Sequence, residues 1–150
     1  MPDPIPMSRD ALSYYCQMNI IDHAGPKGQI HLEGQSTPLF FAQVRDAIAY
    51  LKAPEREARI TAIYVSDMGN APNWKNPGVR NWTAARTATF VVGAGVRGGM
   101  GAPEIVPFAK PEDADAFIDR YGGTAMTIDE IPDDAVLAPV DLNTPLEEPS

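Results

Sequence analysis

The sequence predicts an α+β protein with two ββαβ halves that form an internal repeat, between an irregular N-terminal leader and a disordered C-terminal tail. Three observations lead to this prediction: a helical pattern occurs twice with matching residues, apolar segments flank each helix, and Pro-rich segments bound the core. We expect the leader at 1–10, the first half at 11–70, a linker loop at 71–81, the second half at 82–137 and the tail at 138–150.

The repeat appears when FFAQVRDAIAYL (40–51) is aligned with PFAKPEDADAFI (107–118). The identical pairs are Phe41 and Phe108, Ala42 and Ala109, Asp46 and Asp113, Ala47 and Ala114, and Ala49 and Ala116. In each copy we expect a strand that leads directly into a helix. Pro111 stands near the second helix start, where a missing N–H costs little. Glu112 beside it favours the positive end of the helix dipole.

Apolar segments rich in β-branched and aromatic residues surround each predicted helix. We expect strands at 37–42 and 59–68 around the first helix, and at 105–109 and 124–131 around the second. A hairpin should open each half. QIHLEGQSTPLFF would turn near Gly34 and form the first, and WTAARTATFVVGAG would form the second.

Composition limits the classes of function. The 150 residues, with 44% hydrophobic and 21% charged side chains, suit a globular protein that buries a core without staples. A net charge of −8 repels phosphate backbones, so we expect no nucleic-acid partner. The single cysteine excludes an internal disulfide. No apolar run approaches the roughly 20 residues of a membrane helix, and we expect no signal segment in MPDPIPMSRD, which lacks a charged-then-apolar pattern.

Sulfur and imidazole side chains are concentrated near the N-terminus. Cys16 and Met18 are two residues apart, so on an extended segment both would point to the same side. A thiolate and a thioether are soft ligands, which favour Cu(I) over Mg²⁺ or Ca²⁺. The alternative is that both side chains are small apolar fillers of the core.

A third sulfur stands in an unusual context. Met100 lies in the sequence Gly98-Gly99-Met100-Gly101, without apolar neighbours at helical or strand spacing. A methionine on a flexible glycine loop suits capture and release of a soft metal. Its alternative interpretation is a plug packed beneath the loop.

Three further residues are weaker candidates for the same site. His23, in the turn-like DHAGPKG segment near the cysteine, is our choice for a nitrogen ligand. His31 stands in a predicted strand, where a single imidazole is more often structural. Met68 ends another predicted strand, and ordinary packing explains it more simply.

Other conspicuous residues favour structural roles. Asp46 and Asp113 occupy matching helix starts, which indicates a folding role common to both halves rather than catalysis. Trp74 and Trp82 flank a Pro/Asn-rich loop, where packing is a simpler account than docking. No G-x-S-x-G, H-E-x-x-H, phosphate-binding loop or CxxC motif occurs, so we expect no enzyme.

Several segments together resemble the NosL family, the nitrous oxide reductase accessory proteins. They occur in family order over residues 15–138, most of the chain. These segments are CQM (16–18), DHAGPKGQIHL (22–32), PLFFAQVRDAIAYL (38–51), ITAIYVSDMG (60–69), RGGMGAPEIVPF (97–108) and DEIP (129–132).

The resemblance implies a periplasmic, usually lipid-anchored copper chaperone that binds one Cu(I). It implies delivery of copper for the copper–sulfide cluster of nitrous oxide reductase, with a membrane ABC-type maturation complex as partner. It also implies two ββαβ half-domains, similar to part of organomercurial lyase. The family's C-x-M motif falls on Cys16 and Met18, and its Gly-flanked methionine on Met100, with His23 as our proposed further ligand.

Two departures from the family stand out. Gln17 occupies the position between cysteine and methionine where the family often has glycine, and the lipid-bearing N-terminal cysteine is absent from this chain. Two alternative functions stay open. One is a scaffold of the maturation complex that binds no metal. The other is a thiol enzyme with a Cys16–His23 pair, for which no third orienting group is evident.

Overall fold

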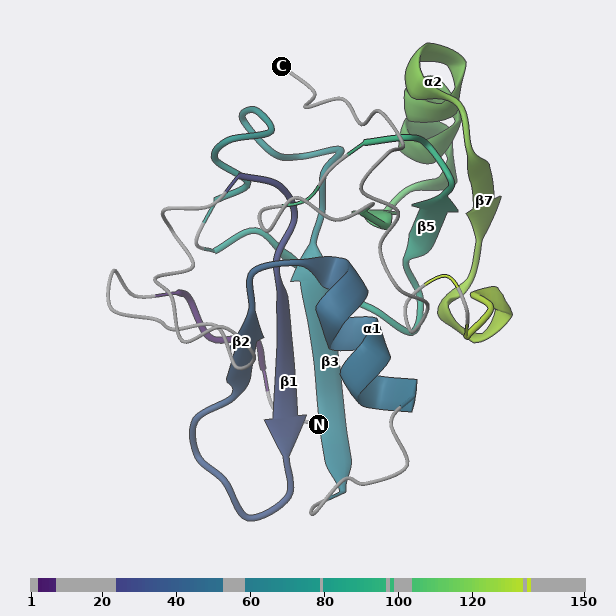
Figure 1. The fold of residues 1–150 in the computed structure, drawn as a ribbon. Coiled ribbons are helices and arrows are strands. Elements are labelled where there is room, and N and C mark those ends of the chain that lie inside the picture. The colour runs from purple at the N-terminus through teal and green to yellow at the C-terminus, as the bar shows by residue number, and fades with distance from the viewer. Residues whose placement is uncertain are drawn as a thin grey trace.

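The computed structural model describes residues 3–7, 24–52, 59–78, 80–96, 98, 104–133 and 135. Within these ranges the chain forms a mixed α+β fold of two small sheets and two α-helices (Figure 1). Its elements in order are β1 (Gly28–Leu32), β2 (Leu39–Phe41), α1 (Val44–Lys52), β3 (Ile60–Ser66), β4 (Trp82–Ala84), β5 (Thr89–Val92), β6 (Val106–Phe108), α2 (Pro111–Tyr121), β7 (Thr124–Met126) and the 3₁₀ helix η2 (Ile128–Glu130).

The first sheet has the antiparallel order β2-β1-β3-β4. β1 lies between β2 and β3, so Gly28 pairs with Phe41 on one side and with Val65 on the other. Helix α1 lies across the sheet in front of β1 and β3 (Figure 1). Gly28 is needed at this crossing because an added Cβ would lie 2.8 Å from the Ala47 Cβ of the helix.

The second sheet has the antiparallel order β6-β5-β7, and α2 packs on it. In both sheets, the strand that follows the helix pairs with the central strand: β3 pairs with β1, and β7 pairs with β5. The strand that precedes the helix pairs with the other edge of the same central strand. Phe41 pairs with Gly28 and Phe108 pairs with Thr89, so the two aligned phenylalanines end their strands opposite the first residue of a central strand. The class of fold is therefore the predicted one, whereas the internal repeat stays a prediction.

The hairpin predicted in WTAARTATFVVGAG is wrong. β4 pairs with β3 and β5 pairs with β6 and β7, so the segment divides between the two sheets. The residues between β4 and β5 lack the Gly or Asn that a tight hairpin turn requires. Ala85 and Ala88 are buried instead, and Ala85 N–H donates to the Ile63 carbonyl at 2.9 Å.

The strand predicted at 124–131 is also too long. β7 ends at Met126, and η2 follows. Thr127 and Glu130 form a capping box, in which the Thr127 N–H donates to Glu130 Oε1 at 2.9 Å. The sequence carries the T-x-x-E signature of this capping box, but its apolar neighbours favour a strand.

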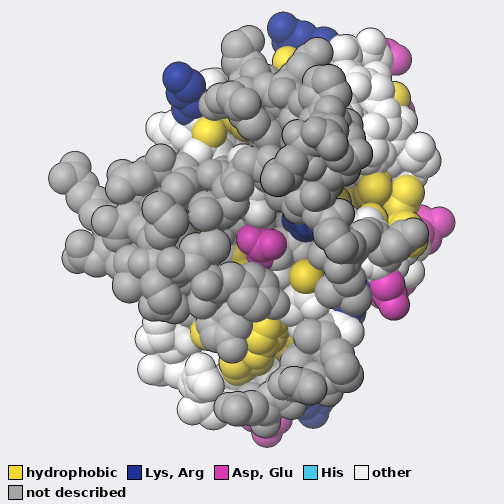
Figure 2. Space-filling view, viewed as in Figure 1, with side chains coloured by type: hydrophobic (Ala, Val, Ile, Leu, Met, Phe, Trp, Pro, Cys, Tyr) yellow, Lys and Arg dark blue, Asp and Glu magenta, His cyan; other side chains and the backbone are white. Residues whose placement is uncertain are grey.

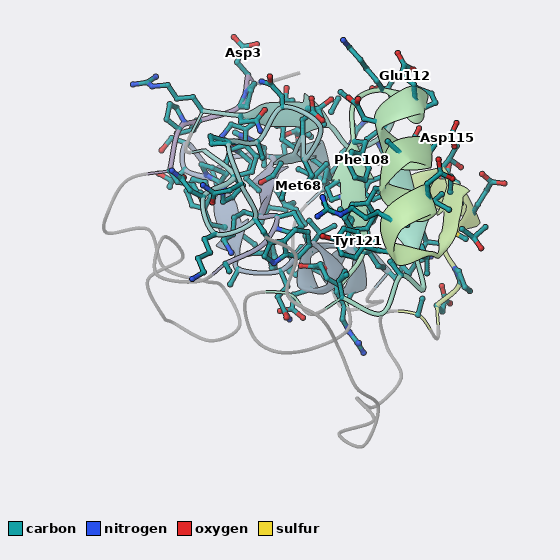
Figure 3. All side chains as sticks on the ribbon, turned by 90° about the horizontal axis from the view of Figure 1, so that it is seen from above. Asp3, Met68, Phe108, Glu112, Asp115 and Tyr121 are labelled. Atoms are coloured by element: carbon teal, nitrogen blue, oxygen red, sulfur yellow. The ribbon has the colours of Figure 1, made fainter. Side chains whose placement is uncertain are left out.

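Two clusters of apolar side chains hold the layers together. The larger lies between the first sheet, α1 and the inner face of the second sheet, and includes Ile63 and Phe90. The smaller lies between the other face of the second sheet and α2, and includes Val91 and Phe108. Adjacent residues Phe90 and Val91 thus face different clusters, as alternation along a strand requires. Figure 3 shows the outer side of α2, where Glu112 points away from the protein.

The described residues 3–7 have no regular secondary structure but are tied to the first sheet. Ile5 N–H donates to Gln29 Oε1 at 2.9 Å, and Gln29 Nε2 donates back to the Ile5 carbonyl at 2.9 Å. Met7 packs against Phe40 and Trp82. Within the described ranges, no helix is long and apolar enough to cross a membrane.

On the face shown in Figure 2, hydrophobic side chains of some described residues are visible at the surface. Among the large hydrophobic side chains described, Ile5 is exposed, at 36%. Scattered apolar exposure of this kind is ordinary for a globular protein.

Candidate metal site

The predicted ligands Cys16, Met18, His23 and Met100 lie outside the described residues, so their arrangement stays a prediction. The structure does describe residues next to two of them. Ala24 directly follows His23, and Gly98 precedes Met100 by two positions. The placement of these neighbours shows where the chain enters and leaves the two candidate segments.

Both neighbours lie beside the start of helix α1. The ammonium of Lys27 donates to the Ala24 carbonyl at 2.9 Å and to the Ala42 carbonyl at 3.0 Å, so these two carbonyls share one donor. Gly98 packs close to Gln43, because a Cβ on that glycine would lie 2.8 Å from Gln43 Oε1. Segments far apart in sequence therefore meet around residues 42–45.

Lys27 is a buried cation, with 1% of its surface exposed. Its main chain is fixed to β3, since Lys27 N–H donates to Ser66 Oγ at 2.9 Å and Ser66 N–H donates to the Lys27 carbonyl at 3.0 Å. Burial lowers the pKa of Lys27 to about 8, an effect partly offset by the negative charge of Glu104.

Glu104 supplies the buried carboxyl group of the same region, with 3% of its surface exposed. Its Oε2 accepts the Val44 N–H at 3.0 Å, and its Oε1 accepts the N–H groups of Arg45 at 2.8 Å and Ile105 at 2.9 Å. The carboxylate therefore caps the first turn of α1 from a distant part of the chain. Burial raises the pKa of Glu104 to about 8, against the effect of these three hydrogen bonds.

His31 is held in a structural arrangement, as its strand position indicates. It is buried in β1, its Nε2 lies 2.8 Å from Gln29 Oε1, and its ring meets Tyr64 edge-on at 5.8 Å. Burial lowers the pKa of His31, which favours the neutral ring. These contacts assign the imidazole to the outer face of the first sheet, where it packs and hydrogen-bonds.

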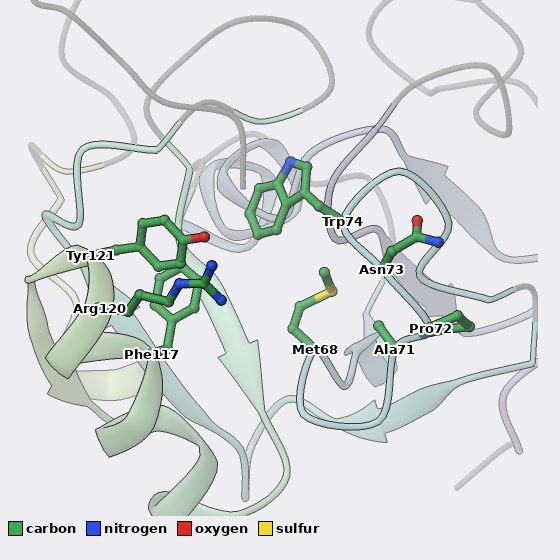
Figure 4. A pocket seen from close by; sticks show the side chains of 8 residues that line it. All are labelled: Met68, Ala71, Pro72, Asn73, Trp74, Phe117, Arg120 and Tyr121. Atoms are coloured by element: carbon green, nitrogen blue, oxygen red, sulfur yellow. The ribbon is translucent and has the colours of Figure 1, made fainter. Parts of the chain in front are cut away.

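Met68 is half-buried just after β3 and packs against the smaller apolar cluster, between the second sheet and α2. Figure 4 shows it beside Trp74 at a cavity of about 210 Å³ between the loop after β3 and the end of α2. Phe117 stacks on Trp74 with ring centroids 6.4 Å apart, and the Arg120 guanidinium lies 5.4 Å from the Tyr121 ring centroid.

The two tryptophans have packing roles. Trp74 is 4% exposed, and its indole lies against Gly25, where an added Cβ would come within 3.4 Å of the ring. Its Nε1 is buried, and no other described residue forms a hydrogen bond with it. Trp82 packs against Phe40, with ring centroids 6.3 Å apart.

The paired aspartates at the helix starts have separate local roles. Asp46 Oδ2 accepts a hydrogen bond from Gln43 Nε2 at 3.1 Å, and burial raises the pKa of Asp46. Asp113 lies against Gly69, where any side chain would collide with its carboxyl group. Neither arrangement resembles a catalytic site.

Sequence reasoning missed Lys27 and Glu104. Each is a single charge placed directly before an apolar strand, between or beside Gly and Pro, which is an ordinary sequence pattern for a loop. Their burial depends on tertiary packing rather than on a local signal. Among the described residues, no group of three or more His, Cys, Asp or Glu side chains could hold a metal ion.

The chain is similar in sequence to proteins of one known family. A family model described as NosL matches residues 4–136. The chain is 52% identical over 139 residues to the copper-binding lipoprotein NosL of Achromobacter cycloclastes, covering 92% of this chain and 72% of that protein. It is 31% identical over 136 residues to the copper-binding lipoprotein NosL of Stutzerimonas stutzeri, covering 90% and 68%.

Solved structures agree with these relatives. The crystal structure of the copper chaperone NosL from Shewanella denitrificans matches with a TM-score of 0.78 at 34% identity, covering 87% of this chain and 97% of that one. The solution structure of apo-NosL from Achromobacter cycloclastes matches with a TM-score of 0.56 at 51% identity, covering 81% and 95%. The names of these proteins describe copper binding and a copper chaperone, not an enzyme, as expected for this chain.

Proposed function

Because the chain belongs to the NosL family, we propose that it is a Cu(I)-binding metallochaperone. Its cargo would be delivered for assembly of the copper sites of nitrous oxide reductase, above all the copper–sulfide cluster. The observation that carries the proposal is 52% identity, over 92% of the chain, to a protein named for copper binding. Copper is the cargo here, so the site must release the metal as well as hold it.

The proposed ligands are Cys16, Met18 and Met100, with His23 as a nitrogen donor. Thiolate and thioether sulfur suit Cu(I), and the thiolate is the anchor because metal binding deprotonates a thiol. The described neighbours support one shared site, since Ala24 and Gly98 both lie beside residues 42–45. Copper binding needs the thiolate, so affinity falls as pH falls.

The proposed location is the periplasm, with a lipid anchor and a membrane ABC-type maturation complex as partner. The name lipoprotein, which both curated relatives carry, supports an anchored protein. The partner is what the resemblance to the NosL family implies for a protein with this cargo.

We also propose that the two halves are copies of one ββαβ unit. Matching strand orders around β1 and β5 support this proposal, as does the shared register of Phe41 and Phe108. β4 extends the first sheet, although its residues fall in the range proposed for the second half. On this proposal the division between the halves would come after β4, a few residues later than residue 82.

A competition titration with a Cu(I) chelator tests the function. We expect Cys16→Ser to reduce Cu(I) affinity greatly and Met100→Leu to reduce it less. Met126→Leu, a volume-conserving change in β7, serves as the matched control and should leave affinity unchanged. Wild-type affinity in Cys16→Ser would overturn the proposed function. A protein that retains no Cu(I) at all under reducing conditions would favour the scaffold role instead.

A further inference from the structure

The outer face of the first sheet, on the side away from α1, carries a row of side chains from three neighbouring strands. In the strand register, Gln29 of β1 pairs with Phe40 of β2 on one side and with Tyr64 of β3 on the other. Residues that pair across strands point to the same face of a sheet, so these three side chains lie next to one another. Ile30, the next residue of β1, belongs to the larger apolar cluster on the α1 side, which places Gln29 on the outer face.

The amide of Gln29 is fixed so that it binds a main chain. Gln29 is fully buried, and its Nε2 donates to the Ile5 carbonyl at 2.9 Å while its Oε1 accepts the Ile5 N–H at 2.9 Å. His31 Nε2 lies 2.8 Å from the same Oε1. Because an amide oxygen only accepts, His31 carries its proton on Nε2 and donates it, which holds the amide in this orientation. Gln29 therefore presents one donor and one acceptor to a single extended residue.

The segment that Gln29 binds has the sequence DPIPM (3–7). Proline has no N–H, so Ile5 supplies the only main-chain donor of the central PIP, and Gln29 accepts it. The ring of each proline fixes its own φ, and a residue that precedes proline is held in extended conformations. The segment is thus extended before it binds, which lowers the entropic cost of binding.

A methionine makes the second contact of this segment with the sheet. Met7 is buried against Phe40 and Trp82, whose ring centroids lie 6.3 Å apart, and aromatic rings are favourable neighbours for a thioether sulfur. Ile5, in contrast, is 36% exposed, so the sheet binds the main chain of this residue and leaves its side chain at the surface. Recognition therefore combines one main-chain unit with one methionine side chain two residues later.

We propose that the outer face of the first sheet is a peptide-binding face, which residues 3–7 occupy as a displaceable ligand. The partner is an extended segment of another polypeptide, with an apolar residue between two prolines and a methionine two residues after it. The described contacts that hold residues 3–7 are the two hydrogen bonds of Gln29 and the packing of Met7. A segment attached at these two points exchanges with a partner of the same chemistry, because both compete for one face.

Binding of a synthetic peptide to the full chain tests this proposal. The probe is PDPIPM (2–7) with blocked ends, and the NMR signals of the Gln29 side-chain amide and the His31 ring report its binding. Ile5→Pro in the protein removes the N–H that Gln29 accepts, at an exposed position away from the core, so it weakens the resident segment. We expect the probe to bind this variant about tenfold more tightly than wild type. The same affinity for both proteins, or binding to neither, would overturn the proposal.

A control peptide separates recognition from adhesion to an apolar surface. The probe carrying Ile5→Pro keeps the length and extended shape but lacks the N–H, so it should bind about tenfold more weakly than the original probe. Equal binding of the two peptides would overturn the proposal. This comparison uses the Ile5→Pro protein alone, so it does not depend on how any further variant folds.

Gln29→Met tests the face itself, because it keeps the length of the side chain and removes both the donor and the acceptor. In the Ile5→Pro background it should abolish binding of the probe, whereas Gln35→Met, at an exposed position of the β1–β2 turn, should leave binding unchanged. Circular dichroism establishes that both variants are folded, and full binding to a folded Gln29→Met protein would contradict the proposal. A wild-type dimer in sedimentation at the same concentrations would assign the face to residues 3–7 of a second copy and overturn the partner proposed.

Discussion

The two helices begin in different ways, although they occupy matching places in the two halves. α2 begins at the surface with Pro111, and its N-cap residue Lys110 makes no side-chain capping bond. α1 begins in the interior, where Val44 and Arg45 donate to Glu104, 60 and 59 residues further along the chain. One helix start is thus local and solvated, and the other is built from a distant carboxylate.

This difference explains why the start of α1 depends on a distant residue and the start of α2 does not. The first N–H groups of a helix need acceptors, and water supplies them at an exposed end. At a buried end the acceptor has to come from the protein. In α1 that acceptor is Glu104, so the stability of this helix start depends on one side chain from a distant part of the chain.

The largest expected effect on stability comes from removing the Glu104 side chain, which accepts the first N–H groups of α1. Glu104→Ala leaves three buried backbone N–H groups, two of them in α1, without their acceptor, so the free energy of unfolding should fall by about 3–5 kcal/mol. Urea denaturation at neutral pH measures it. A loss below about 1 kcal/mol, the usual value for a surface interaction, would show that the two helix starts are equivalent.

The next largest effect should be the pH dependence of the unfolding free energy that arises from Glu104 at the buried start of α1. Burial raises the pKa of Glu104 from 4.5 to about 8, so between these values the folded protein holds a proton that the unfolded chain releases. The stability from this group is complete below about pH 4.5 and is lost as pH rises through about 8. Relative to Glu104→Gln, wild type should therefore lose at most about 1.4 kcal/mol of unfolding free energy per pH unit.

Urea denaturation of both variants from pH 5 to 7.5 measures this slope. The lowered pKa of His31 acts in the opposite direction below about 6.5, since protonation of the unfolded chain then disfavours folding. That contribution is present in both proteins and cancels in the difference. A flat difference over this range would mean that the Glu104 carboxyl group titrates at its ordinary pKa.

A smaller effect is expected where α2 meets the first half of the chain. Gly69 lies so close to Asp113 that Gly69→Ala must displace the carboxyl group or the loop, which should cost about 1–3 kcal/mol. In an Asp113→Ala background the carboxyl contacts are gone and only the β-carbon, 2.9 Å away, remains, so the same change should cost less. Thermal unfolding of the four proteins gives the coupling, and additive losses would show that the loop, not Asp113, resists the methyl group.

The smallest effect should come from the exposed start itself. Glu112 stands in the first turn of α2 and interacts with the helix dipole in water. Glu112→Gln should lower the unfolding free energy by about 0.3–1 kcal/mol, and added salt should reduce the difference. A loss as large as that of Glu104→Ala would remove the distinction between the two helices.

The sequence predicted the local features and missed the long-range ones. Pro111 and its acidic neighbours marked the start of α2, and Gly34 marked the turn between β1 and β2. The assignment of β4 and β5 to different sheets was missed, because it depends on buried alanines that no periodicity distinguishes. Glu104 and Lys27 were missed for the same reason, since only packing decides that a loop charge is buried.

X-ray absorption at the copper edge of the Cu(I)-loaded protein tests the central claim most directly, because it counts the sulfur and nitrogen neighbours of the ion. The account predicts mainly sulfur neighbours, one fewer in Met100→Leu, and loss of the thiolate contribution in Cys16→Ser. Copper surrounded only by nitrogen and oxygen, or a spectrum unchanged in both variants, would contradict it.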